Sequence, residues 1–245
     1  MDNGISFVFD LDGTLINSTE IGDKIEREIY KTFNIEVDKQ TEKEIEELTY
    51  EIIQGENRKN LGIKLMWAIF KKLGLNFFQR VRALYISSKI FKEENKKVDL
   101  YDGVSDLFTF LDENNYNYAI ATTSSKDEAD DRLTKFSDLY NKLDGKIITR
   151  SDVKHLKPHP ESITKAAKLM KTSLNRVVMV GDMHTDIQMG KEVDAITIGV
   201  LTGVFSEKKF KAYNPDFIIP SVAQIPELIP QIKQRIKDNN NASRQ

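Results

Sequence analysis

From Leu100 onward, short apolar segments alternate with segments of helical periodicity, and this alternation constrains the fold more than any other feature of the chain. Strands that alternate with helices form a parallel sheet with helices on both faces. We therefore predict an α/β fold with a doubly wound parallel sheet. The expected strands are Tyr116–Ala121, Lys146–Thr149, Arg176–Gly181, Ala195–Val200 and Asp216–Ile219. The expected helices are Val104–Asn114, Lys126–Phe136, Pro160–Met170 and Asp186–Glu192.

Near the start of the chain, the apolar and β-prone segment Ser6–Phe9 is expected to add a further strand to the same sheet. A block free of proline separates it from the other strands, and in this block apolar residues recur at helical spacing. The block predicts four or five helices, with candidate breaks at Gly55, Gly62 and Gly74. It is therefore interpreted as an all-α insertion at 16–98 within a core domain formed by 1–15 and 99–237.

The C-terminal region divides into an apolar and a polar part. Ile225–Ile236 is expected to form a closing helix. Residues 238–245 are polar and rich in asparagine, and segments of this kind bury too little apolar surface to fold. We therefore predict a disordered tail at 238–245.

Composition and charge exclude several classes of function. The net charge of −2 gives no electrostatic argument for a nucleic acid or an anionic membrane as partner. The absence of cysteine excludes disulfides, thiolate catalysis and cysteine metal sites, and the three scattered histidines do not suit a zinc site. No apolar run approaches the ~20 residues that span a bilayer, and the start has no signal-peptide pattern. A soluble cytoplasmic protein, monomeric or homodimeric, is expected.

Two aspartates, Asp10 and Asp12, directly follow the first expected strand and precede Gly13 and Thr14. In open α/β sheets, ligands bind at the carboxyl ends of the strands. Two carboxylates this close repel each other unless a cation lies between them. The pair therefore indicates a cation or ligand site, although an aspartate-rich turn remains the alternative.

Four hydroxyl residues, Thr122 to Ser125, follow the strand Tyr116–Ala121 and precede a helix. Hydroxyls and free backbone amides at such a position suit an anion. Capping of the helix by Ser124 or Ser125 explains part of the pattern equally well. Thr122 is the better candidate for a ligand contact, because it lies closest to the strand.

A single lysine, Lys157, precedes a Pro-x-Pro turn in which Pro160 can open the next helix. The stiff backbone of this turn would hold the ammonium group in place. A fixed ammonium group can neutralise an anionic ligand. The alternative is an ordinary surface lysine.

The strand Arg176–Gly181 ends in Gly-Asp, and a second aspartate, Asp186, follows Asp182 by four residues. Asp186 can also simply stabilise the start of a helix. With the first two aspartates, however, the chain presents four carboxylates at strand ends, and an all-oxygen ligand set suits magnesium. His184 lies between these aspartates and is interpreted as an exposed loop residue rather than a substrate contact.

The order of these motifs resembles the haloacid dehalogenase (HAD) superfamily. The resemblance rests on Asp10-Leu11-Asp12-Gly13-Thr14, Thr122, Lys157-Pro158 and Gly181-Asp182-x-x-x-Asp186, and covers the chain to about Ile229. The helical insertion is similar to the cap of the first HAD subfamily, which includes phosphoglycolate phosphatases and β-phosphoglucomutases. The resemblance implies a HAD-like Rossmannoid core with an inserted all-α cap domain.

The same resemblance implies catalytic roles for four residues. Asp10 would be the nucleophile that forms an aspartyl-phosphate, and Asp12 would be first the general acid and then the general base. Lys157 would hold the nucleophile and the phosphoryl charge. Thr122 would bind a phosphoryl oxygen, with Thr123 as a further substrate contact.

A magnesium ion is also implied by the resemblance. Its ligands would be Asp10, Asp182 and the backbone carbonyl of Asp12, with Asp186 acting through water or as an orienting residue. No other cofactor is expected.

The function implied is hydrolysis of a small phosphomonoester, with 2-phosphoglycolate as the first candidate. Basic residues in the insertion, Arg58 or Lys59, would meet a second anionic group of the substrate, unless they form only a solvated cluster at a helix end. The main alternative is a phosphomutase of the β-phosphoglucomutase type. Asp12 argues against a dehalogenase, whose chemistry needs no acid for a leaving alcohol, and the complete motif set argues against a non-catalytic protein.

Overall fold

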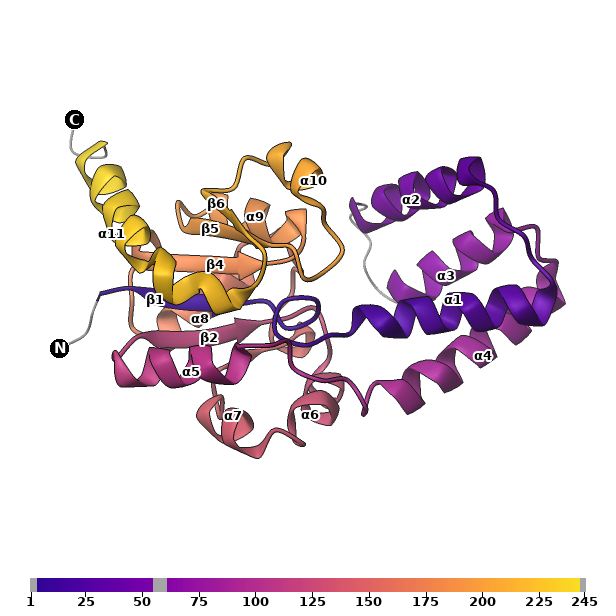
Figure 1. Ribbon diagram of the computed structural model, residues 1–245, viewed down its shortest axis with the longest axis horizontal. Helices are drawn as coiled ribbons and strands as arrows, with labels where there is room; N and C mark the ends of the chain where they lie inside the picture. The colour runs from indigo at the N-terminus through magenta and orange to yellow at the C-terminus, as the bar shows by residue number, and fades with distance from the viewer. Residues whose placement is uncertain (1–3, 55–60, 243–245) are drawn as a thin grey trace. The chain divides into compact units, whose positions relative to one another are not determined.

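The computed structural model describes residues 4–54 and 61–242. Within them, six parallel strands form one sheet in the order β3-β2-β1-β4-β5-β6 (Figure 1). The predicted α/β fold with a doubly wound parallel sheet is therefore confirmed. The strands are β1 (Ser6–Phe9), β2 (Asn117–Ala121), β3 (Ile147–Ile148), β4 (Val177–Gly181), β5 (Ile196–Val200) and β6 (Phe217–Ile219).

The chain divides into two compact units. The core unit comprises Met1–Thr19 and Val98–Gln245, and the insert unit comprises Glu20–Lys97. The core unit contains the whole sheet and most of the helices. These helices are α5 (Val104–Glu113), α6 (Lys126–Leu133), α7 (Ser137–Lys142), α8 (Glu161–Leu169), α9 (His184–Lys191), α10 (Glu207–Lys211) and α11 (Ile225–Ala242).

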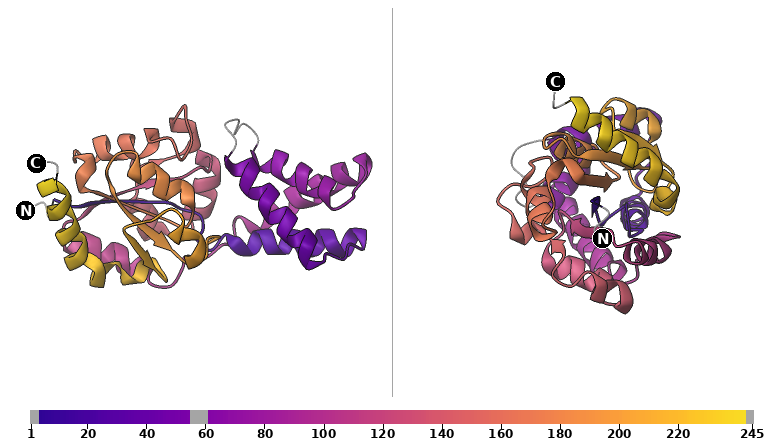
Figure 2. Two further views of the ribbon diagram at one scale, coloured as in Figure 1. Left: turned by 90° about the horizontal axis from the view of Figure 1, so that it is seen from above. Right: turned by 90° about the vertical axis from the view of Figure 1, so that its left-hand side faces the viewer.

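Helices lie on both sides of the sheet (Figure 2). Alternating side chains of the strands pack against them in two separate layers. On one face, Val8 and Met179 pack with Ile163 of α8 and Met189 of α9. On the other face, aromatic rings meet in a chain of contacts that runs from β1 to α5 and β2. Because every residue of β1 is buried, the loop that follows it starts from a rigid position.

The described part of the insert unit consists of helices and the segments that connect them. The helices are α1 (Thr19–Phe33), α2 (Lys39–Gln54), α3 (Leu61–Lys72) and α4 (Phe77–Glu94). Ile29 of α1, Phe70 of α3 and Ala83 of α4 contribute to a buried apolar cluster. Gly74, with a φ of +80°, lies in the turn between α3 and α4.

Several predicted boundaries need correction. Gly62 lies inside α3 and breaks no helix, whereas Gly55 lies outside the described residues. The helix expected at Lys126–Phe136 is shorter than predicted, because α6 ends at Leu133. Phe136, with φ −101° and ψ 67°, is not helical and directly precedes α7, which was not predicted. The short helix α10 was not predicted.

The predicted disordered tail is wrong for residues 238–242, because α11 continues to Ala242. The apolar side chains of Ile229, Ile232 and Ile236 form its buried stripe. Neither glycine nor proline follows Ile236 to end the helix, and Gln234 donates a hydrogen bond to Asp238 at 2.8 Å. Among the described helices, none is both long enough and apolar enough to cross a membrane.

Candidate active site

The site lies where the strand order reverses. The chain first adds β2 and β3 on one side of β1, and then adds β4 on the other side. Asp10 follows β1, and its backbone N–H donates to the carbonyl of Val180 in β4 at 2.8 Å. Asp182 directly follows β4. The two aspartates therefore meet at the carboxyl ends of adjacent strands, which is where open α/β sheets bind ligands.

Three carboxylates gather at this point. Oxygen atoms of Asp10, Asp182 and Asp186 lie within 4.8 Å of one another, and all three residues are buried. Asp186 joins the cluster from the first turn of α9, where its Oδ2 also accepts the N–H of Met183 at 3.1 Å. Asp186 thus acts as a helix cap and as a cluster member at the same time.

Lys157 provides the positive charge for this cluster. Its Nζ donates to Oδ1 of Asp10 and to Oδ1 of Asp186, each at 2.6 Å, and the residue is only 3% exposed. The surface-lysine alternative is therefore excluded. Lys157 comes from the segment before α8, far from either aspartate in the sequence, so no local pattern could have indicated both contacts.

Burial and mutual repulsion control the acidity of the cluster. Burial raises the pKa of Asp10 to about 7, although Lys157 opposes the shift. Burial also raises the pKa of Asp182 well above its ordinary value, and the charges of Asp10 and Asp186 add to this. Although burial alone would lower the pKa of Lys157, its two carboxylate partners hold it above its ordinary value.

The donor set fits a magnesium ion. Its members are carboxylate oxygens, the hard ligands that this cation prefers. One ammonium group faces three carboxylates, so the cluster carries excess negative charge when all three are ionised. Burial, together with the neighbouring carboxylates, raises the pKa of Asp10 and of Asp182. A divalent cation would offset the excess negative charge.

A loop after β5 contacts Asp182. The backbone N–H of Val204 donates to Oδ2 of Asp182 at 3.0 Å. A Cβ atom at Gly13 or at Gly203 would collide with the Asp182 carboxylate, so both positions need glycine. Thr202 ties the loop to the β1 side by donating to the carbonyl of Gly13 at 2.6 Å. This loop was not predicted as part of the site, because it contains no charged residues.

The hydroxyl residues after β2 have different surroundings. Thr122 is buried, and its Oγ1 accepts the N–H of Ser124 at 3.0 Å, whereas Thr123 is exposed. Ser125 caps α6 in a reciprocal arrangement with Glu128. Of the two serines proposed as caps, Ser125 has that role, and Ser124 contacts Asp12 instead.

The side chain of Asp12 lies outside the three-carboxylate cluster. It is 29% exposed, and its Oδ2 accepts a hydrogen bond from Ser124 Oγ at 2.8 Å. Its Oδ1 forms an ion pair with Arg132 of α6. Arg132 was not among the predicted site residues. The available signal was an arginine on the helical stripe that also contains Ala129 and Leu133.

The interpretation of His184 as an exposed loop residue is wrong. The residue is 1% exposed and is the first residue of α9. Its ring lies 5.1 Å from that of Phe205 and 5.0 Å from that of Tyr213. Aromatic residues after β5 therefore bury it. Arg58 and Lys59 lie outside the described residues.

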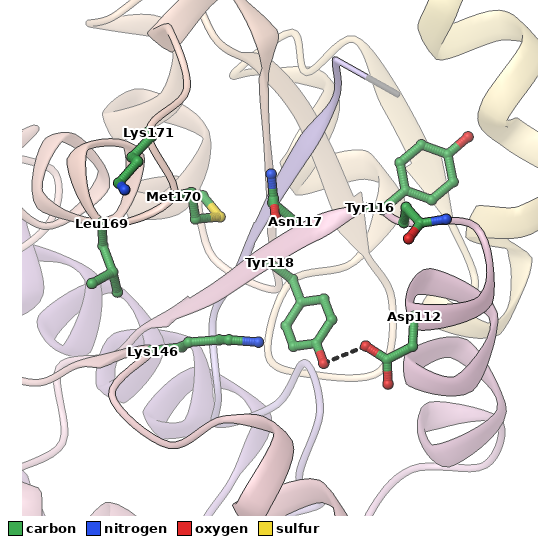
Figure 3. A pocket seen from close by; sticks show the side chains of 9 residues that line it. Asp112, Tyr116, Asn117, Tyr118, Lys146, Leu169, Met170 and Lys171 are labelled. Carbon is green, nitrogen blue, oxygen red and sulfur yellow. Dashed lines mark hydrogen bonds between the residues drawn. The ribbon is translucent and has the colours of Figure 1, made fainter. Parts of the chain in front are cut away.

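A hollow of about 360 Å³ lies at the other end of β2 (Figure 3). Three of the polar residues that line it contact one another. Tyr118 donates to Asp112 at 2.7 Å, and Lys146 lies over the Tyr118 ring, with Nζ 4.3 Å from its centroid. The hollow is separate from the aspartate cluster, which lies at the carboxyl end of the strands, and no role is assigned to it.

Comparisons with known proteins agree with the geometry. The family model described as haloacid dehalogenase-like hydrolase matches residues 7–200. Pyrophosphatase PpaX from Listeria monocytogenes is 27% identical over 225 residues, which are 91% of this chain and 95% of that protein. Pyrophosphatase PpaX from Bacillus mycoides is 28% identical over 227 residues, which are 92% and 96% of the two chains.

Two solved structures are similar in fold. A predicted phosphoglycolate phosphatase from Haemophilus somnus has a TM-score of 0.72 at 19% identity, over 94% of this chain and 99% of that chain. A hydrolase from Pseudomonas syringae has a TM-score of 0.67 at 22% identity, over 93% and 99%. At such identities, the likeness establishes the fold.

Proposed function

Because the chain belongs to the haloacid dehalogenase-like hydrolase family and is therefore a hydrolase, we propose that it is a magnesium-dependent phosphatase that works through an aspartyl-phosphate. The observation that carries the proposal is the contact of Lys157 with Asp10 and Asp186 inside a cluster of buried carboxylates. Phosphoryl transfer depends mainly on positioning and on neutralising charge. The cluster holds the carboxylate of Asp10 in a fixed position and places the positive charge of Lys157 beside it.

In the proposed reaction, a carboxylate oxygen of Asp10 attacks phosphorus, and the bond from phosphorus to the leaving oxygen breaks. Asp12 gives its proton to that oxygen. Asp12 then takes a proton from water, which attacks the aspartyl-phosphate and releases phosphate, so that both carboxylates return to their starting state. Lys157 offsets the negative charge at the reacting centre.

Further groups complete the proposed site. Asp10, Asp182 and Asp186 would hold magnesium together with the backbone carbonyl of Asp12, and the ion would supply charge neutralisation when bound. Thr122 and Thr123 are proposed to bind the phosphoryl oxygens. The insert unit is proposed to be the cap that selects the substrate. It corresponds to the all-α insertion that was predicted at residues 16–98.

The proposed substrate is a small phosphate compound whose leaving group carries a second negative charge. Two names among the similar proteins support this: a pyrophosphatase acts on a phosphate bonded to phosphate, and a phosphoglycolate phosphatase acts on a phosphate bonded to glycolate. Arg58 and Lys59 are proposed to contact the second anion. We place the enzyme in the cytoplasm, as a monomer or homodimer, without a nucleic-acid partner.

Phosphate release from a substrate panel tests the proposal. The panel contains 2-phosphoglycolate, pyrophosphate, a hexose 1-phosphate, a nucleoside monophosphate and a phosphopeptide. We expect the highest kcat/KM with 2-phosphoglycolate or pyrophosphate, no activity after chelation and recovery with magnesium. Full activity after exhaustive chelation, or a preference for the phosphopeptide, would contradict it. Conversion of the hexose 1-phosphate to its 6-phosphate would identify a phosphomutase instead.

A further inference from the structure

Arg132 is a buried charge that the proposed reaction does not yet use. It lies on the inward side of α6, between Ala129 and Leu133, and its side chain is 5% exposed. Burial of an arginine is unfavourable unless a carboxylate or several hydrogen-bond acceptors pair with it. The carboxylate that pairs with Arg132 is Asp12, 120 residues earlier in the sequence.

Three side chains, those of Arg132, Ser124 and Asp12, each contact the other two. Arg132 pairs with Oδ1 of Asp12 and also donates to Oγ of Ser124 at 2.9 Å. Ser124 in turn donates to Oδ2 of Asp12 at 2.8 Å. Both oxygens of the Asp12 carboxylate are therefore anchored, and the two anchoring residues are anchored to each other.

We propose that Arg132 and Ser124 are positioning residues that fix the orientation in which the Asp12 carboxylate exchanges protons with the leaving group and with water. This inference rests on the proposed phosphatase function. Each carboxylate oxygen has a second lone pair, so the two contacts leave Asp12 able to carry the proton. An error of ~1 Å in the position of such a group can reduce the rate by ~10²-fold.

The contacts have a second interpretation, in which Asp12 only neutralises a buried arginine and stabilises α6. The two interpretations differ in their dependence on the leaving group. A nitrophenyl phosphate has a good leaving group and needs little help from an acid in the first step, whereas an alkyl phosphate needs that help. Loss of orientation at Asp12 therefore affects the alkyl phosphate more strongly.

The first experiment compares kcat/KM for an alkyl phosphate and a nitrophenyl phosphate in R132M, R132K and S124A. We expect R132M to lose at least roughly 10-fold more activity on the alkyl phosphate than on the nitrophenyl phosphate, with a smaller difference for R132K and S124A. The matched control is R150M, because Arg150 forms an exposed ion pair with Glu128 of α6 at 3.5 Å. R150M should retain the wild-type ratio of the two substrates.

The second experiment combines R132M with D12N in a double-mutant cycle. If Arg132 acts through Asp12, R132M should change the residual activity of D12N by no more than about 2-fold. An equal loss in both backgrounds, or an unchanged substrate ratio in a folded R132M protein, would overturn the inference. If R132M does not fold, S124A is used in its place, and the same two results are compared: the ratio of the two substrates and the effect of the substitution in the D12N background. A wild-type protein that releases phosphate from no substrate would instead refute the proposed function.

Discussion

One ammonium group, that of Lys157, faces three buried carboxylates in the described part of the chain. Its two short contacts join Asp10, which follows β1, to Asp186, in the first turn of α9. The same group therefore neutralises the proposed nucleophile and ties two elements together. Exposed ion pairs contribute little to stability, but removal of one partner of a buried pair is strongly destabilising.

Substitution K157M should therefore reduce both activity and stability. We expect kcat to fall by about 10²–10³-fold, since the reacting centre loses a fixed positive charge. We expect the melting temperature to fall by roughly 10 °C, because the variant leaves buried carboxylates without their partner. The control K165M removes a lysine that is 42% exposed and pairs with Glu161. It should melt within about 2 °C of the wild type, and an equal shift in both variants would contradict this account.

Asp182 should destabilise the metal-free protein, because burial and two neighbouring carboxylates raise its pKa in the folded state. A carboxyl group with a raised folded-state pKa binds more protons in the folded than in the unfolded chain, so its presence lowers stability as the pH rises. D182N should therefore melt at least about 2 °C above the wild type at about pH 8, and this difference should shrink toward about pH 5. Magnesium should raise the melting temperature of the wild type and not that of D182N. A less stable D182N in chelator at about pH 8 would contradict the prediction.

At the scale of elements, the site is built from the ends of β1 and β4, the start of α9 and the loop after β5. The strand-end aspartates were predictable, because an apolar run followed by Asp is a local pattern. The loop after β5 was not, because its role rests on a backbone N–H from Val204 and on the absence of a side chain at Gly203.

Substitution G203A tests the role of this loop. The added Cβ atom would collide with the Asp182 carboxylate, so that the loop or the carboxylate must move. We expect the magnesium concentration for half-maximal activity to rise roughly 10-fold, as for other changes beside metal ligands. The control is G22A in α1, where an added Cβ meets nothing within 4 Å. Equal magnesium dependence in both variants would rule out the proposed role of the loop.

At the scale of the whole molecule, the sheet order brings together residues that are far apart in the sequence. The alternation of strands and helices predicted this sheet, and the motif order predicted the family. The contact of Lys157 with Asp10 was expected from the family resemblance, but its second contact, with Asp186, was not. The contact of Arg132 with Asp12 was not predicted either, because it spans 120 residues and depends on packing. His184 was misjudged because its burial depends on rings from after β5. The helical extension of α11 was missed because composition alone suggested disorder.

The proposed division of labour between the two units can be tested through Arg58. R58A should reduce kcat/KM for 2-phosphoglycolate and pyrophosphate by roughly 10-fold, about the value of one charge-assisted hydrogen bond. Activity on a nitrophenyl phosphate, which has no second anionic group, should change by less than about 2-fold. R27A, which removes an exposed arginine of α1, is the control. An R58A protein with equal losses on all three substrates would remove this residue from the specificity proposal.

The central claim is that the Asp10 carboxylate becomes phosphorylated during turnover. Acid quenching of the enzyme with magnesium and substrate, followed by peptide mass spectrometry, tests it directly. In the wild type, we predict a phosphoryl group on the peptide that contains Asp10. D12N should carry more of this label, because loss of the general base slows hydrolysis of the intermediate. D10N should carry no label and should lose at least ~90% of the wild-type turnover. Rapid phosphate release without label on Asp10, or a D10N variant with more than about a tenth of the wild-type rate, would contradict the account.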